Sequence, residues 1–129
     1  MPAPAPIESI TTAALSLALD AASLRQQAIA ANMANAGTPG YAPLTVNFED
    51  QLEDARRALQ ARGRLDEATL AGVQPRLEAQ PALGGVPARL QLDMEAANLA
   101  QNSVHYQALL KGLSRHYALL ASAVSDGKK

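Results

Sequence analysis

The sequence predicts an all-α fold in which long N- and C-terminal helices pair as an antiparallel coiled coil, with a short helix and an irregular middle segment. Apolar positions near both ends alternate in steps of four and three residues, which is typical of paired helices. Apolar residues make up 48% of the 129 residues but aromatic residues only 3%. This composition favours narrow helix contacts over a thick globular core.

The N-terminal helix is expected to begin near residues 9–12, because hydroxyl side chains cap helix N-termini. It carries two apolar stripes. The first apolar stripe is Ile10, Ala14, Leu17, Ala21, Leu24, Ala28, Ala31 and Asn35, and the second is Leu15, Leu19, Ala22, Gln26, Ile29 and Met33. A helix in a two-helix hairpin needs only one stripe. Either the middle segment folds back over the second stripe, or other subunits cover it.

The C-terminal helix is predicted from residue 92 onward by the same alternation. Its apolar positions are Leu92, Ala96, Leu99, Ser103, Tyr106, Leu110, Leu113, Tyr117, Leu120 and Val124. At about 1.5 Å per residue, this helix spans roughly 50 Å. Two long amphipathic helices of this kind predict a core formed by both ends of the chain.

The middle of the chain breaks this pattern. Phe48, Leu52, Ala55 and Leu59 predict a short amphipathic helix over residues 48–62, and Gly and Pro residues then predict an irregular segment over 63–91. The predicted organisation is therefore an N-terminal helix and corner (1–41), a middle segment (42–91) and a C-terminal helix (92–129).

Few residues suggest chemistry. His105 and His116 lie about 16 Å apart along one helix, too far to share a metal ion. The acidic residues from Glu49 to Asp54 are expected to form a solvated face. A net charge of −1 gives no reason to expect a nucleic-acid partner, and the chain has no cysteine. We expect no enzyme activity, no cofactor, no metal site and no small-molecule substrate.

The end of the N-terminal helix has two interpretations from its residues: an ordinary capped helix end, or a rigid corner with a defined exit direction. Its residues are Asn32, Asn35, Gly37, Thr38, Pro39, Gly40 and Tyr41. The two amides can bond free main-chain groups at the helix end. Gly37 is expected to adopt a positive φ that stops the helix, and Pro39 prevents its continuation.

The stretch from residue 31 to residue 41, ANMANAGTPGY, resembles the N-terminal signature of the bacterial flagellar rod, hook and hook-associated axial proteins. The stretch NSVHYQALL at residues 102–110 is similar to a C-terminal segment of the same family. The short chain, without a large inserted domain, favours the proximal-rod members.

The resemblance implies a structural subunit that assembles helically, transmits torque and forms part of the export channel. It implies contacts with copies of itself, other rod proteins, membrane-ring and export-gate components and the rod-base adaptor. It places the chain in the periplasmic rod of the basal body, exported without a cleaved signal peptide. The N-terminus agrees with this expectation, since it has neither a basic start nor an apolar run of signal-peptide length.

The residues expected at the assembly interface are Leu15, Leu19, Ile29, Met33, Tyr106, Leu113, Tyr117 and Leu120. Two alternatives remain at this stage. One is another small rod subunit of the same family. The other is a cytosolic helical-hairpin adaptor or export chaperone, which would be a well-folded monomer or dimer in solution.

Overall fold

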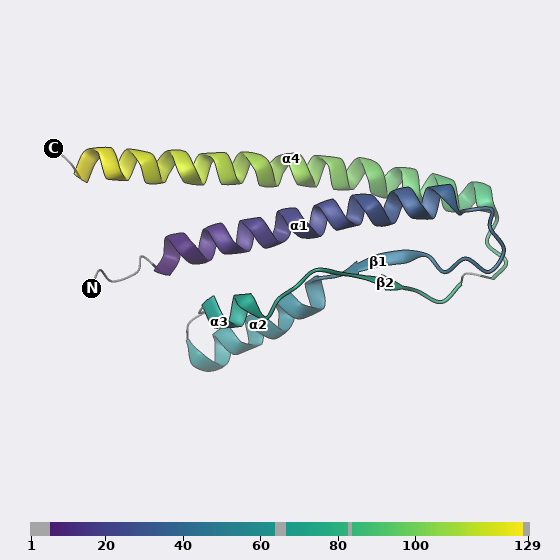
Figure 1. Ribbon diagram of the computed structural model, residues 1–129, viewed down its shortest axis with the longest axis horizontal. Helices are drawn as coiled ribbons and strands as arrows, with labels where there is room; N and C mark the ends of the chain where they lie inside the picture. Colours follow the sequence, from purple (N-terminus) through teal and green to yellow (C-terminus); the bar gives the residue numbers. More distant parts are fainter. Residues whose placement is uncertain (1–5, 64–66, 83, 128–129) are drawn as a thin grey trace.

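The computed structural model describes residues 6–63, 67–82 and 84–127 (Figure 1). The elements along the chain are α1 (Pro6–Ala34), β1 (Leu44–Asn47), α2 (Glu49–Arg62), α3 (Glu67–Ala71), β2 (Arg76–Ala79) and α4 (Ala88–Gly127). The two long terminal helices predicted from the sequence are confirmed. The fold is not purely helical, however, because two short strands are present.

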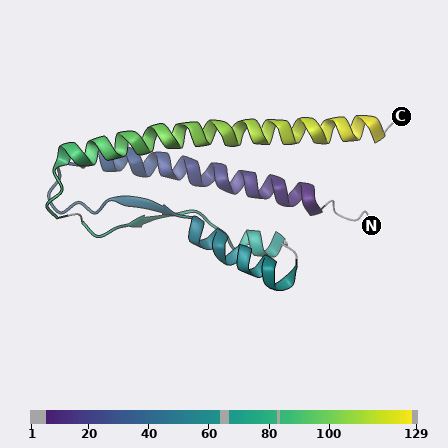
Figure 2. The ribbon, with the colours of Figure 1, turned by 180° about the vertical axis from the view of Figure 1, so that it is seen from behind.

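Helices α1 and α4 lie side by side and run in opposite directions, so that the start of α1 and the end of α4 lie at the same end of the molecule (Figures 1 and 2). Contacts along the pair define the register. Asn102 Nδ2 donates to the Ala22 carbonyl at 3.0 Å, and His116 Nε2 lies 3.1 Å from Thr12 Oγ1. At the other end of the pair, Glu95 on α4 accepts a hydrogen bond from α1.

The inner face of α4 differs in part from the predicted one. Its half-buried or buried positions include Glu95, Leu99, Asn102, Leu109, Leu113, His116 and Leu120. The steps of four and three are therefore correct, and Leu99, Leu113 and Leu120 are correctly placed. The alternate positions are shifted by one residue, because Asn102 and His116 face α1 instead of Ser103 and Tyr117. Helix α4 also begins four residues earlier than predicted, directly after Pro87, a residue well suited to a helix start.

Helix α1 lies between α4 and the middle segment, and both of its apolar stripes are covered within the chain. The second apolar stripe faces α4, since Leu15 packs against Gly112 and Ala22 contacts Asn102. The first apolar stripe contributes Ala21 to a core formed with the middle segment. Of the two alternatives for the second apolar stripe, the chain itself therefore provides cover, but through α4 and not through the middle segment. Helix α4 covers the second apolar stripe, which leaves the middle segment free to cover the first.

The segment predicted to be irregular, 63–91, contains α3 and β2. Strand β2 pairs with β1 in an antiparallel two-stranded sheet, with Leu44 opposite Ala79 and Val46 opposite Leu77. The sheet lies beside α1 (Figure 1). Helices α2 and α3 lie in the connection between the two strands, so they extend from the end of the sheet that is farther from the corner. A two-stranded sheet is marginal on its own, so its packing on α1 is what stabilises it.

A small core joins the middle segment to α1. It contains Ala21, Val46, Phe48, Ala55 and Val73, with Leu17, Ala18, Leu24 and Leu52 packed around it. Phe48 is the only phenylalanine in the chain, and the small side chains around it keep the core thin. The scarcity of aromatic residues predicted this property.

Helix α2 matches the predicted short helix closely. Gly63 ends it in the left-handed conformation, at φ 73°, and its N–H donates to the Leu59 carbonyl at 2.7 Å. On the exposed face, a hydrogen bond from Arg56 lowers the pKa of the Glu53 carboxyl. Arg57 Nε lies 3.8 Å from the same carboxylate.

Candidate functional site

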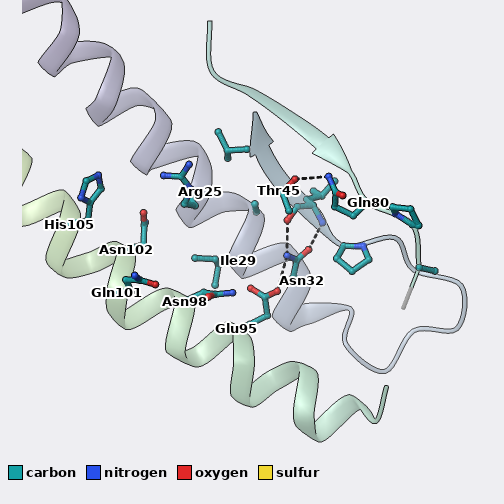
Figure 3. A pocket seen from close by; sticks show the side chains of 16 residues that line it. Arg25, Ile29, Asn32, Thr45, Gln80, Glu95, Asn98, Gln101, Asn102 and His105 are labelled. Atoms are coloured by element: carbon teal, nitrogen blue, oxygen red, sulfur yellow. Dashed lines mark hydrogen bonds between the residues drawn. The ribbon is translucent and has the colours of Figure 1, made fainter. Parts of the chain in front are cut away.

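Asn32, near the end of α1, joins three parts of the molecule. Its Oδ1 accepts hydrogen bonds from the Tyr41 hydroxyl at 2.9 Å and from the Leu44 N–H at 2.8 Å. Its Nδ2 donates to the Leu44 carbonyl at 2.9 Å and to Glu95 Oε1 at 3.1 Å (Figure 3). With 6% of its surface exposed, Asn32 uses the full bonding capacity of its amide. One side chain thus ties the corner, the strand β1 and the helix α4 together.

Asn35 acts locally at the same corner. Its Nδ2 donates to the Ala31 carbonyl at 2.9 Å, which satisfies an acceptor of the last helical turn, and its own carbonyl accepts the Thr38 N–H at 2.9 Å. The Tyr41 N–H then donates to the Thr38 carbonyl at 3.2 Å. The predicted corner is therefore a hydrogen-bonded unit, in which Asn35 caps the helix and Asn32 sets the exit direction.

The glycine prediction at this corner is wrong in its position. Gly37 does not have a positive φ, whereas Gly40 does, at 75°. The Asn35 amide and the main-chain turns provide hydrogen-bond partners for the main-chain groups at the helix end. A left-handed residue is therefore needed only where the chain turns towards Tyr41. Pro39 lies between the two glycines, after the end of the helix, as predicted.

A groove of about 830 Å³ opens next to Asn32. Helix α1 contributes Ala28 and Ile29, α4 contributes one wall, and the start of β1 with the chain after β2 contributes the other (Figure 3). The α4 wall is polar, with Glu95, Asn98, Gln101, Asn102 and His105 along it. The groove therefore combines an apolar floor with amide groups on one side.

Asn102 lies where the groove meets the contact between the long helices. Only 5% of its surface is exposed. Its Nδ2 donates to the Ala22 carbonyl at 3.0 Å and to Gln26 Oε1 at 3.3 Å, whereas its buried Oδ1 has no hydrogen-bond partner among the described residues. A buried acceptor without a donor is costly, so this atom needs an explanation.

The residues expected at the assembly interface are not brought together in one place. Ile29 is buried, with 3% of its surface exposed, and Leu15, Leu19 and Met33 are half-buried on the same helix. On α4, Leu113 and Leu120 are half-buried towards α1, whereas Tyr106 and Tyr117 are exposed. No contact with a second chain tests these assignments, so they stay predictions.

Several exposed apolar residues lie along one side of α4. We call this set the α4 outer flank, and it consists of Leu92, Tyr106, Leu110, Tyr117 and Val124. All five belong to the apolar alternation predicted for this helix. Exposed apolar surface that continues along a helix is typical of interaction sites, so the α4 outer flank is a candidate contact surface.

Sequence reasoning missed two residues that position the site. Glu95 gave no recognisable signal. Asn102 opens the stretch that resembles the C-terminal segment of the axial family, and that resemblance was the available clue. Within residues 6–63, 67–82 and 84–127, no group of three or more His, Cys, Asp or Glu side chains is arranged to hold a metal ion. No helix in these ranges is long and apolar enough to cross a membrane.

These features define a class: an elongated structural chain whose two terminal helices pair and whose corner, held by Asn32, carries the middle segment. The chain is similar to the flagellar basal body rod protein FlgB of Escherichia coli K12, with 29% identity over 129 residues, covering 85% of this chain and 89% of the relative. The FlgB of Proteus mirabilis HI4320 is 33% identical over 124 residues, covering 85% and 90%. The FlgB of Yersinia enterocolitica is 29% identical over 125 residues, with the same coverage. The chain belongs to the FlgB family of flagellar basal body rod proteins. No family model matches it.

Proposed function

We propose that the chain is a structural subunit of the flagellar basal-body rod, in its proximal part. The observation that supports this most directly is the pairing of both chain ends as long helices beside the Asn32 corner. The FlgB relatives, named as rod proteins, cover most of the chain. They do not favour the adaptor or chaperone alternative, or another small rod subunit.

In the proposed assembly, α1 and α4 pack as an antiparallel coiled coil that lies along the rod axis. The α4 outer flank then meets neighbouring subunits, where Tyr106 and Tyr117 bury their exposed rings. Many packed contacts of this kind carry torque together, so no single group is required for it. Copies arranged around a common axis leave a central channel for export.

The three predicted parts of the chain take distinct roles in this proposal. The N-terminal helix with its corner (1–41) and the C-terminal helix (92–129) form the rod core. The middle segment (42–91) is directed by the corner towards other subunits. The partners are copies of the chain, other rod proteins, and components of the membrane ring, the export gate and the rod base.

We place the assembled protein in the periplasmic rod of the flagellar basal body, reached through the flagellar export apparatus without a cleaved signal peptide. The role is structural, and we propose no catalytic step. The wide coverage of rod-protein relatives supports this placement.

The proposal is tested by deleting the gene from the bacterium that encodes the chain and restoring it on a plasmid. We expect the deletion to abolish swimming in soft agar and to remove the rod from isolated basal bodies seen by electron microscopy. The restored strain should regain both. Density for the chain in the basal bodies would give its position directly.

A deletion strain with complete rods and normal swimming would contradict the proposed function. If the chain is found only in the cytosol of the cells, bound to export cargo, the adaptor alternative is supported instead. Fractionation of cells carrying an epitope-tagged chain separates these two results.

A further inference from the structure

The outer edge of β1 is only partly occupied. The Gln80 N–H donates to the Pro43 carbonyl at 2.7 Å, so residues 43, 45 and 47 direct their main-chain groups towards β2. By the alternation of an antiparallel ladder, Leu44 and Val46 direct theirs the other way, towards the groove. Asn32 binds both main-chain groups of Leu44. Among the described residues, the N–H and carbonyl of Val46 form no main-chain hydrogen bond outside the β1–β2 pair.

The lining of the groove also suits an extended chain. Val46 and Asn102 both line it, on opposite sides of its α1 floor. An extended chain lying in the groove, between β1 and α4, can bond its main chain to the outward main-chain groups of Val46. A helix offers no free main-chain donors along its length, so this edge favours an extended occupant.

The chain itself carries a matching edge. The same alternation directs the main-chain groups of Leu77 and Ala79 away from β1, and all four residues of β2 are exposed. Leu77 exposes 42% of its surface, although it is a large apolar residue. Its side chain fits an apolar floor such as that formed by Ala28 and Ile29.

We propose that β2 of a second copy inserts into this groove and pairs with the outer edge of β1. Two copies that point in the same direction bring β2 of one antiparallel to β1 of the other, as within the chain. The result is a four-stranded sheet that crosses the subunit boundary. Because the groove and the β2 edge are different surfaces, the contact is head-to-tail and repeats from copy to copy. This inference deepens the proposed rod function and rests on it for its biological setting.

The first test uses cross-linking between single-cysteine variants, because the chain has no cysteine of its own. One variant carries Leu77→Cys on β2 and the other carries Gln101→Cys on the groove wall. The two proteins are mixed at high concentration, or co-expressed in the deletion strain, and treated with a short bis-maleimide. The control replaces Gln101→Cys by Gln107→Cys, which is also an exposed glutamine on α4 but outside the groove lining.

We expect the Leu77→Cys and Gln101→Cys pair to give a cross-linked dimer, at about tenfold higher yield than the control pair. Equal yields from both pairs would overturn the proposal, and so would the absence of the dimer from both samples. If the purified proteins form the dimer but deletion of the gene does not affect swimming, the contact is upheld and the rod function is rejected. The strand contact and the rod function are therefore tested independently.

A second test removes one edge donor without touching the sheet inside the chain. Leu77→Pro deletes an N–H that points away from β1, and proline is tolerated on such an edge. We expect the variant to keep its helical circular dichroism and to weaken self-association by about tenfold in sedimentation experiments. Leu77→Val, which keeps the N–H, is the matched control. Self-association of Leu77→Pro equal to that of Leu77→Val, or a groove filled by a helix in basal-body density, would contradict strand insertion.

Discussion

Asn32 binds the main chain of Leu44 at both its N–H, at 2.8 Å, and its carbonyl, at 2.9 Å. The side-chain amide thereby takes the place of a neighbouring strand and fixes β1 to α1. Gln51 does the same for Gln74, donating to its carbonyl and accepting its N–H at 2.8 Å each. Side-chain amides at two points therefore hold a sheet that is too small to be stable alone.

The first prediction concerns the removal of this anchor. Asn32→Ala deletes four hydrogen bonds and leaves the Leu44 main-chain groups without partners, so we expect it to lower the free energy of unfolding by about 2–4 kcal/mol. Urea denaturation followed by circular dichroism measures the change. Asn35→Ala is the matched control and should cost less than about 1 kcal/mol, because it removes one local bond to the Ala31 carbonyl and one long, exposed bond from the Thr38 hydroxyl, at 3.4 Å.

Equal losses for the two alanine variants would show that the corner does not depend on Asn32. Asn32→Asp adds a sharper comparison. A carboxylate still accepts from Tyr41 and Leu44, but it cannot donate to the Leu44 carbonyl and it repels Glu95. We therefore expect Asn32→Asp to be destabilised as well, and to recover part of the loss at a pH low enough to protonate the carboxylates.

The second prediction compares two glycines of the corner. Gly40→Ala places a side chain at φ 75°, which costs roughly 1–2 kcal/mol. Gly37→Ala has an ordinary backbone and no atom within 4 Å of the added carbon, so it should raise stability by about 0.4–1 kcal/mol through the unfolded state. Thermal unfolding of both variants gives the sign. Destabilisation by Gly37→Ala larger than that by Gly40→Ala would contradict the corner geometry described here.

The positions of the helices were predictable because apolar periodicity records helix faces over long distances. The assignment of partners to faces was not. On α4, apolar residues occupy both the inner face and the α4 outer flank, so the alternation through Leu110 and Tyr117 combined positions from two faces of the helix. The true inner face includes Asn102 and His116, which an apolar pattern does not identify.

The strands escaped prediction for a different reason. Leu44–Asn47 and Arg76–Ala79 are four residues long, and the second contains charged residues on an exposed edge. Such segments become strands because Asn32 and Gln51 hold the adjoining main chain. Each amide lies far in sequence from the main chain that it binds, by 12 residues for Asn32 and by 23 residues for Gln51. The corner residues were identifiable as a unit, whereas the destination of the Asn32 amide was not.

The third prediction separates stability from assembly at Asn102. Asn102→Leu removes a buried acceptor that has no donor, and replaces it with an apolar side chain of similar size between α1 and α4. We expect the free energy of unfolding of the isolated chain to stay within about 1 kcal/mol of the wild-type value or to rise. Swimming should nevertheless be impaired, because a buried asparagine fixes the register of the paired helices. A variant that is both as stable and as motile as the wild type would remove any role of this amide.

The final prediction concerns the surface proposed to contact neighbouring subunits. Tyr117 exposes 51% of its surface on the α4 outer flank, so Tyr117→Asp should change the free energy of unfolding by no more than about 0.5 kcal/mol while it abolishes swimming. Arg115→Asp is the control, because a position two residues away lies on the opposite side of the helix and should leave swimming intact. Leu19→Asp should also abolish swimming, but for another reason: Leu19 is half-buried in the chain, and a carboxylate there should destabilise the α1–α4 pair by about 2 kcal/mol or more. Soft-agar motility and urea denaturation of all three variants distinguish the two causes. Normal swimming by Tyr117→Asp would exclude the flank as an assembly surface, whereas loss of swimming by Leu19→Asp without loss of stability would restore the second apolar stripe as the contact.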